Sequence, residues 1–255
     1  MQADAITSDI VGYTTIPIQS KYQIIGVNFQ NVSGGSLKLN EAIPYQEGMT
    51  KGTNGANADN IQIGNSTGGW TVYFMSNGKN AKGKDVAGLE GKWSLSGTYA
   101  AADVDLTPGT AFWYVRSNAD ESTFNLTIAG SVSTLPSADY EFASQYRIFA
   151  NPYPTPLAIN DAFPYNAATM TAGTNGANAD NIQIGNGTGG WTVYFLSNGK
   201  NAKGKDVAGL EGKWSLSGSY AVTDATIPVG KAAWYVRKDT TKPAVSITLT
   251  RPYSL

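Results

Sequence analysis

The chain has 255 residues, a formal net charge of −1, and charged side chains at 15% of its positions. This sparse, balanced charge argues against a nucleic-acid-binding protein, for which a basic face is expected. The sequence contains no cysteine and no histidine, which excludes disulfides, Ser-His-Asp and Cys-His catalysis, and thiolate or imidazole metal sites. No apolar run approaches the ~18 residues of a membrane-spanning helix, so we expect no such helix.

The middle of the chain is duplicated. When the sequence is shifted by 121 positions, residues 52–100 align with residues 173–221, and only three of the 49 pairs differ: Ser66/Gly187, Met75/Leu196 and Thr98/Ser219. Weaker similarity continues on both sides of this block. We therefore predict two copies of one unit, residues 1–132 and 133–255, each the size of an independent domain. A single domain built from two interlocked halves is the alternative.

Short runs rich in β-branched and aromatic residues alternate with turn signals such as Gly-Gly and Asn-Gly throughout each unit. In chain order, the first unit is predicted to form strands over residues 14–18, 22–29, 37–39, 60–63, 70–76, 92–96, 110–116 and 123–128. Only the segments LNEAI and INDAF, at 39–43 and 159–163, are predicted to form a helical turn. The predicted fold class is all-β, with each unit an antiparallel β-sandwich or jelly roll.

The two copies also indicate which side of each strand is buried. In the strand at 123–128, alternate positions stay apolar in both copies while the positions between them stay polar. In the preceding strand Trp113 is kept as Trp234, but Phe112 becomes Ala233, a loss that costs ~3–5 kcal/mol in a close-packed core. We therefore predict that Trp113 points into the core and that Phe112 lies on the looser face.

A loop with the sequence NGANADN is present in both units, at residues 54–60 and 175–181. Its composition is typical of Asx turns and left-handed backbone. We therefore expect that its side chains stabilise a turn. Its oxygen atoms are also of the kind that calcium prefers, although each loop has one carboxylate and lacks the EF-hand spacing. The alternative is therefore a calcium site, which would use Asp59, Asn57, Asp180 and Asn178. Calcium is the only cofactor that the sequence suggests.

A second repeated loop reads GKNAKGKD, at residues 78–85 and 199–206. It matches the Gly-x-x-x-x-Gly-Lys part of a phosphate loop, but Asp85 stands where a Ser or Thr hydroxyl should reach magnesium. The carboxylate would repel phosphate, and the following VAGLEG is a poor helix. We expect a loop between strands whose lysines attract anions: Lys79, Lys82, Lys84, Lys200, Lys203 and Lys205.

Aromatic residues are frequent in both units. Exposed Trp and Tyr beside Asn and Asp are typical of sugar-binding β-sandwiches, although packing in a core is the usual role of aromatic side chains. We predict a core role for Trp113 and Trp234. The candidate ligand or assembly surface consists of the six loop lysines together with these aromatic residues: Trp70, Trp93, Tyr99, Trp191, Trp214 and Tyr220.

The near-identical blocks keep their loops as well as their strands. This indicates either recent copying of the block or a surface that both units present to the same kind of partner. Two such surfaces suit multivalent binding or head-to-tail assembly, and the segment at 3–18 is a candidate for strand addition. Glycoside hydrolysis would need two facing carboxylates, and nothing else in the sequence resembles a hydrolase.

The predicted function is therefore a non-enzymatic structural subunit that assembles with copies of itself into an extracellular filament, fibre or surface layer. A carbohydrate-binding surface module or adhesin is the alternative, and a glycoside-acting enzyme comes third. No nucleic-acid partner is expected.

Six strings of the first unit, ITSDIVGYTTIPI, IIGVNFQ, LNEAI, ADNIQIG, GGWTVYF and PGTAFWYVR, resemble a loosely defined group of secreted tandem-repeat proteins. These are proteins of the Verrucomicrobia, Planctomycetes and Lentisphaerae, and the resemblance covers nearly all of the first unit. The second unit lacks the starting motif and has KAAWYVR at its end. The resemblance implies an exported, β-rich surface protein. The opening MQADAITS, typical of a mature secreted chain that begins at Gln2 with Met1 added, indicates the same.

Overall fold

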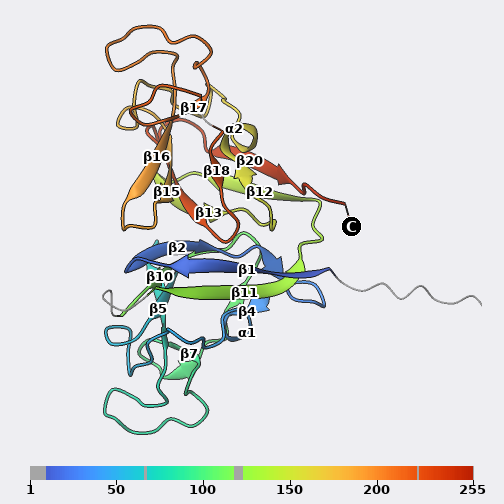
Figure 1. Ribbon diagram of the computed structural model, residues 1–255, viewed down its shortest axis with the longest axis vertical. Helices are drawn as coiled ribbons and strands as arrows, with labels where there is room; N and C mark the ends of the chain where they lie inside the picture. Colours follow the sequence, from blue (N-terminus) through green and yellow to red (C-terminus); the bar gives the residue numbers. More distant parts are fainter. Residues whose placement is uncertain (1–9, 66–67, 118–122, 223, 255) are drawn as a thin grey trace, which may run out of the picture.

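The computed structural model describes residues 10–65, 68–117, 123–222 and 224–254. Figure 1 shows two β-rich lobes stacked along the long axis of the molecule, and the chain passes from the first to the second between β11 and β12. None of the helices in the described ranges is long and apolar enough to cross a membrane. The all-β prediction is confirmed.

The first lobe is built from two antiparallel sheets and a short strand pair. The larger sheet has the order β2-β10-β5-β6-β7-β8, the smaller one has the order β1-β11-β3, and β4 pairs with β9. The elements are β1 (Val11–Ile18), β2 (Tyr22–Gly26), β3 (Phe29–Gln30), β4 (Leu37–Lys38), α1 (Leu39–Ala42), β5 (Asn60–Gly64), β6 (Trp70–Met75), β7 (Trp93–Leu95), β8 (Ala100–Ala101), β9 (Asp105–Leu106), β10 (Ala111–Val115) and β11 (Phe124–Val132).

The second lobe repeats this pairing. Its larger sheet has the order β13-β19-β15-β16-β17, β12 pairs with β20, and β14 pairs with β18. The elements are β12 (Ser137–Phe142), β13 (Tyr146–Ala150), β14 (Leu157–Ala158), α2 (Ile159–Ala162), β15 (Asn181–Gly185), β16 (Trp191–Leu196), β17 (Trp214–Leu216), β18 (Thr226–Ile227), β19 (Ala232–Val236) and β20 (Val245–Thr250). The helical turns predicted after residues 38 and 158 are present as α1 and α2.

Each lobe has its own hydrophobic core. In the first lobe, Ile16 and Leu126 of the smaller sheet pack against Ile61 and Phe112 of the larger sheet. The second core is formed by residues between 142 and 249. Strict alternation along β20, buried at Val245 and exposed at the next residue, agrees with the burial expected for this strand.

The predicted orientations of residues 112 and 113 are wrong. Phe112 is fully buried in the first core, whereas Trp113 is partly exposed on the other side of β10. Part of the volume that is lost at Ala233 is restored on the neighbouring strand, because Phe112 lies opposite Ile25 whereas Ala233 lies opposite Phe149. In the second lobe the phenylalanine of this pair is therefore on the adjacent strand.

Two more phenylalanines fill the second core where the first unit has smaller residues. Phe142 and Phe163 occupy the positions of Ile18 and Ile43, and both are fully buried. The ring of Phe142 lies 4.5 Å from that of Tyr235. The two cores therefore reach close packing with different sets of side chains, which is the kind of exchange that cores tolerate when total volume is kept.

Two predicted strands differ in the structure. The strand expected over 22–29 is divided between the two sheets, because β2 pairs with β10 in the larger sheet and β3 pairs with β11 in the smaller one. At the end of β2, the backbone N–H of Gly26 donates to the carbonyl of Gly230 in the other lobe (2.9 Å). The segment at 3–18, expected to pair with another molecule, contributes β1, which pairs with β11 of the same chain along its whole length. Residues 3–9 lie outside the described ranges.

Candidate functional site

The lobes meet through the outer sides of their larger sheets, where β2 lies close to β13 and β19 (Figure 1). The buried side chain of Asn28 joins them, because its Nδ2 donates to the carbonyl of Asn151 (2.6 Å) and its Oδ1 accepts from the N–H of Gly230 (2.7 Å). A Cβ at Gly26 would lie 2.5 Å from the Cβ of Ala150, so glycine permits this close approach. The joint is therefore a specific, hydrogen-bonded contact.

Tryptophans predicted for the core lie at this joint. The ring centroid of Trp113 is 6.3 Å from that of Trp234 and 6.0 Å from that of Trp191. Small apolar residues are buried beside them: Ile24, Ala150 and Ala232. Trp113 and Trp234, which are present in both copies, were predicted to pack in the cores of their own units. This prediction is wrong, because each side chain packs against the other unit.

On one side of the joint, the two lobes border an open pocket of about 680 Å³. Trp70 contributes from the first lobe, where its side chain is 38% exposed, and Tyr146 and Trp234 contribute from the second. Tyr146 stands edge-on to Trp234, with ring centroids 6.3 Å apart. Polar groups also line the pocket: Asn65, Asp105, Thr110 and Arg147. The sequence analysis identified Trp70 but missed Tyr146 and the polar lining.

The equivalent residues on the other side of the joint make an additional aromatic contact. There Trp191, the counterpart of Trp70, packs against Trp113, and Tyr22 stands edge-on to Trp113 at 6.4 Å. The loop before Trp191 contains Gly187 in the left-handed region (φ 83°), and a Cβ there would lie 2.8 Å from Oε1 of Gln19. The first unit has Ser66 at this position, outside the described residues. Trp191 is 36% exposed and Trp70 is 38% exposed, so the two sides differ in the contact between Trp191 and Trp113 rather than in the exposure of the equivalent rings.

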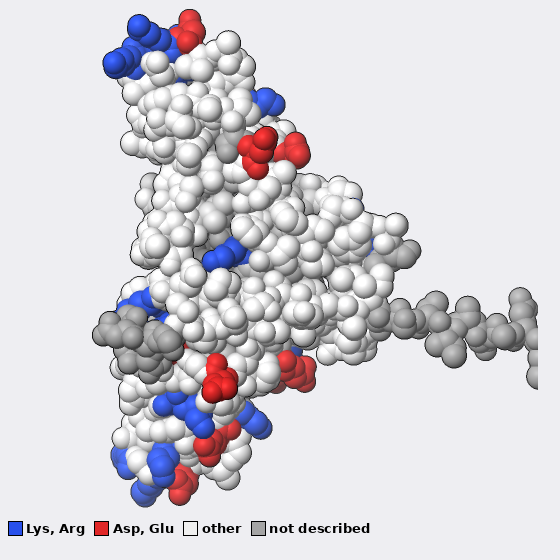
Figure 2. Space-filling view, viewed as in Figure 1, with Lys and Arg blue, Asp and Glu red and all other residues white. Residues whose placement is uncertain are grey.

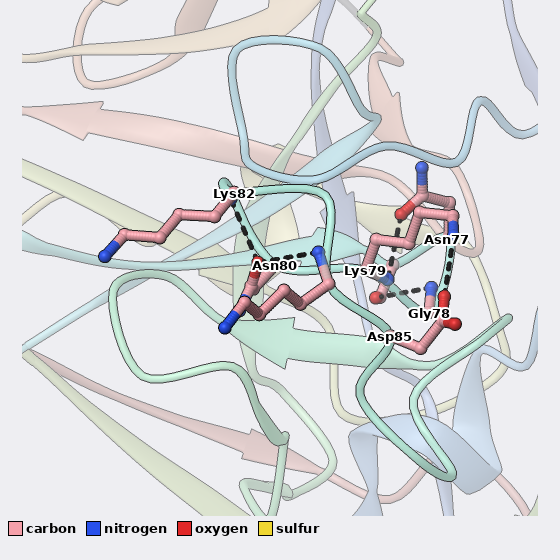
Figure 3. Close-up of polar contacts among 8 residues, drawn as sticks. Asn77, Gly78, Lys79, Asn80, Lys82 and Asp85 are labelled. Carbon is pink, nitrogen blue, oxygen red and sulfur yellow. Dashed lines mark hydrogen bonds and ion pairs between the residues drawn. The ribbon is translucent and has the colours of Figure 1, made fainter.

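The lysine-bearing loop of the first unit is an ordered turn (Figure 3). Lys79 Nζ lies 2.6 Å from Asp85 Oδ1, which closes the base of the loop. Asn80 Oδ1 accepts the backbone N–H groups of Lys82 (2.9 Å) and Lys84 (3.1 Å). The hydrogen bond from Lys79 lowers the pKa of the Asp85 carboxyl. The loop expected between strands is therefore present, and the side chain of Asn80 stabilises its turn.

The second unit repeats this arrangement. Lys200 Nζ lies 2.6 Å from Asp206 Oδ1, and Asn201 Oδ1 accepts the N–H groups of Lys203 and Lys205. Neither loop leads into a helix in the described structure, in agreement with the rejection of a phosphate loop.

Tyr99 holds the first lysine loop and is not an open aromatic surface. Its hydroxyl accepts the N–H of Ala81 (3.0 Å), and its ring stands edge-on to Phe74 at 6.2 Å. Tyr99 and its counterpart Tyr220 have left-handed backbone, with φ of 54° and 50°. Such a conformation costs of order 1–3 kcal/mol in a residue with a side chain. Because both tyrosines have this left-handed backbone, the same conformational cost is present in both units.

Trp93 and Trp214 were predicted as surface residues, and both are fully buried. Their indole N–H groups donate to the carbonyls of Ile43 (2.5 Å) and Phe163 (2.8 Å), the residues at the ends of α1 and α2. A buried indole needs such an acceptor, and a carbonyl about 50 positions away along the chain supplies it. These residues are corrected from surface to core.

The residues proposed for calcium have other partners. Asn57 Oδ1 accepts the N–H groups of Thr53 (2.9 Å) and Asn54 (3.1 Å), as Asn178 does in the second unit. Asp59 is buried and accepts from the hydroxyl of Tyr114 (2.7 Å) and the N–H of Ser117 (2.8 Å). In the described ranges, no three His, Cys, Asp or Glu side chains form a metal-binding group. Calcium binding stays a prediction that this geometry does not favour.

Asp180 repeats the contacts of Asp59, with Tyr235 Oη at 3.1 Å and the N–H of Lys238 at 2.7 Å. In each unit, this buried carboxylate connects the residue just before β5 or β15 to the neighbouring strand, β10 or β19. The aspartate and the tyrosine of WYVR are both present in each copy of the sequence, but nothing in the sequence shows that they are in contact.

We expect the stability contributed by Asp59 to fall as the pH rises. Burial raises the pKa of its carboxyl, although hydrogen bonds from Ser117 and Tyr114 oppose the shift. A raised folded-state pKa gives stability that is fully present below the unfolded value of 3.8 and is lost as the pH rises through the folded pKa. Asp59→Asn has no such titration. Its free energy of unfolding should therefore be lower than that of the parent by more near pH 4 than near pH 7.

Urea unfolding at both pH values, followed by tryptophan fluorescence, measures this difference, at about 1.4 kcal/mol for each unit of pKa shift. Asp180→Asn in the second unit is the matched variant, because burial also raises the pKa of Asp180. A difference that is constant with pH in both variants would contradict the expectation.

The joint pocket and the lysine loops have the chemistry of binding surfaces. Aromatic rings stack on apolar ligand faces, and ammonium groups attract anions. No protein-family model, curated protein or solved structure matches this chain. The functional conclusion therefore depends on the geometry of these surfaces.

Proposed function

We propose that this is a non-enzymatic, exported surface protein that binds a saccharide in the joint pocket. The observation that carries the proposal is that Trp70, Tyr146 and Trp234 surround one open pocket bordered by both lobes. A pyranose ring has an apolar C–H face, which stacks on aromatic rings, and a rim of hydroxyls, which needs hydrogen-bonding side chains. Asn65, Thr110 and other polar groups of the lining would supply these hydrogen bonds.

We also infer that the two lobes are jelly-roll-like domains that arose by duplication, with a boundary between residues 132 and 133. The repeated strand pairing and the separate cores support this division. Because both lobes line the pocket, a binding site of this kind requires both copies and the hydrogen-bonded joint that fixes their relative position.

The filament or surface-layer subunit expected from the sequence stays a prediction. Head-to-tail assembly would use the matching outer surfaces of the two units between molecules, but Trp113 and Trp234 already pack together within one chain. The described part of the N-terminal segment is likewise paired with β11. The first observation favours saccharide binding over head-to-tail assembly, whereas β1 is an edge strand of its sheet and could still pair with another molecule. Negative-stain microscopy of the purified protein tests for polymers.

The saccharide proposal is tested with a matched pair of variants. Tyr146 and Tyr22 are each 57% exposed and each stand edge-on to an equivalent tryptophan, but only Tyr146 lines the open pocket. A ligand is first identified on a glycan array and its affinity is then measured by titration calorimetry. We expect Tyr146→Ala and Trp70→Ala to weaken binding about tenfold, the equivalent of about 1.4 kcal/mol, and Tyr22→Ala to leave it unchanged.

Two results would overturn this function. The first is that no glycan is retained by the folded protein. The second is that Tyr22→Ala weakens binding as much as Tyr146→Ala, because the ligand would then lie elsewhere on the molecule.

A further inference from the structure

The two lysine loops lie at opposite ends of the molecule. In Figure 1 the long loops that follow β6 and β16 extend from the lower and upper ends of the long axis. Figure 2 shows Lys and Arg side chains gathered at both of these ends. We call residues 77–92 and 198–213 the first and second tips. Their sequences are identical, so the molecule presents the same surface twice, in opposite directions.

Charge is divided between the tips and the rest of the chain. Each tip has four lysines and two acidic residues, a net charge of +2. The remaining residues include ten basic and fifteen acidic side chains, a net charge of −5, although the whole chain is nearly neutral. A polyanion is therefore attracted to the two ends and repelled by the region between them.

Each tip directs two amino groups into solvent. Lys79 is paired with Asp85, whereas Lys82 and Lys84 are exposed and have no acidic partner within 4.0 Å among the described residues. Their backbone is fixed by Asn80, as that of Lys203 and Lys205 is by Asn201, and the first tip is also held by the hydroxyl of Tyr99. The ammonium groups therefore extend from an ordered base, which reduces the entropy that is lost when a ligand binds.

We propose that each tip binds an acidic polysaccharide, with carboxylate or sulfate groups along its chain, and that one molecule bridges two such chains. Neither tip contains arginine, the residue whose planar fork suits phosphate, and two lysine charges are few beside one phosphate per ~1.7 Å of duplex DNA. Lysine is a compact charge that suits separated carboxylates or sulfates. Binding at one tip is weak and sensitive to salt, and bridging makes the interaction multivalent.

This second site differs from the joint pocket in its residues and in the chemistry of its ligand. The tips use ammonium groups and attract charge, whereas the pocket uses aromatic rings and requires no charged ligand. The inference does not depend on the saccharide proposal.

The experiment uses the full chain and polygalacturonate as the probe, at low ionic strength. Light scattering reports bridging, and retention on immobilised polygalacturonate reports binding. Three variants are compared with the parent: Lys82→Gln with Lys84→Gln, Lys203→Gln with Lys205→Gln, and all four together. We expect the parent to cause strong scattering that disappears above about 0.3 M salt.

Either two-site variant should still bind through its intact tip but should lose the scattering, and the four-site variant should bind at least tenfold more weakly. Lysine-to-arginine changes at the same positions should keep both signals, neutral dextran should give neither, and Tyr146→Ala in the pocket should change neither. Scattering by a two-site variant equal to that of the parent would overturn bridging. Tighter binding of duplex DNA than of polygalacturonate would overturn the choice of ligand.

Discussion

Replacing Phe112 by alanine is expected to lower the free energy of unfolding of the first lobe by about 3–5 kcal/mol. Phe112 is fully buried between the two sheets, and its neighbour on β2 is the smaller Ile25. At the equivalent position of the second lobe the residue is Ala233, and Phe149 stands opposite it. Urea unfolding followed by tryptophan fluorescence measures the loss.

The double variant Phe112→Ala with Ile25→Phe tests how far the residue opposite position 112 determines this loss. It copies the pair found in the second lobe, but the volume gained from isoleucine to phenylalanine is much smaller than the volume lost from phenylalanine to alanine. We therefore expect it to recover only a minor part of the lost free energy. Ala233→Phe alone should instead overpack the second core and cost about 1–3 kcal/mol. If the effects of Phe112→Ala and Ile25→Phe were simply additive, the two positions would not share a packing site.

The strand content was predictable because the duplication supplied two solutions to the same packing problem. Residues that stay apolar at alternate positions in both copies mark the buried side of β11 and β20, and the strands at 70–76 and 110–116 were placed nearly as observed. The repeated Gly-rich and Asn-rich turns also separated the strands correctly. Local patterns of this kind depend on the periodicity of one strand.

The errors arose where a residue's environment depends on a distant segment. The orientation of Phe112 was predicted from its replacement by Ala233 alone. Part of the compensating change is at the position of Ile25, about 90 positions earlier in the chain. Trp93 was assigned to the surface because nothing near it in sequence identifies the carbonyl of Ile43 as its acceptor. The pocket was missed because Trp70 and Tyr146 come from different units.

Replacing Gly187 by serine is expected to loosen the contact between Trp191 and Trp113 on the side of the joint that contains Gln19. Gly187 has φ of 83°, a conformation that a side chain strains, and a Cβ there would lie 2.8 Å from Gln19 Oε1. Serine is the residue of the first unit at this position, where the equivalent Trp70 borders the open pocket. Release of this loop should separate Trp191 from Trp113 and leave it beside Tyr22, as Trp70 lies near Tyr146.

Acrylamide quenching of tryptophan fluorescence should therefore increase in Gly187→Ser. Gly204→Ser is the matched control, because Gly204 has φ of 75° but no atom lies within 4 Å of its Cβ position, so it carries the backbone strain without the joint contact. Unchanged quenching in Gly187→Ser would mean that the loop stays closed with a serine in place. The difference between the two sides of the joint would then have to come from residues outside the duplicated block, such as Gln19.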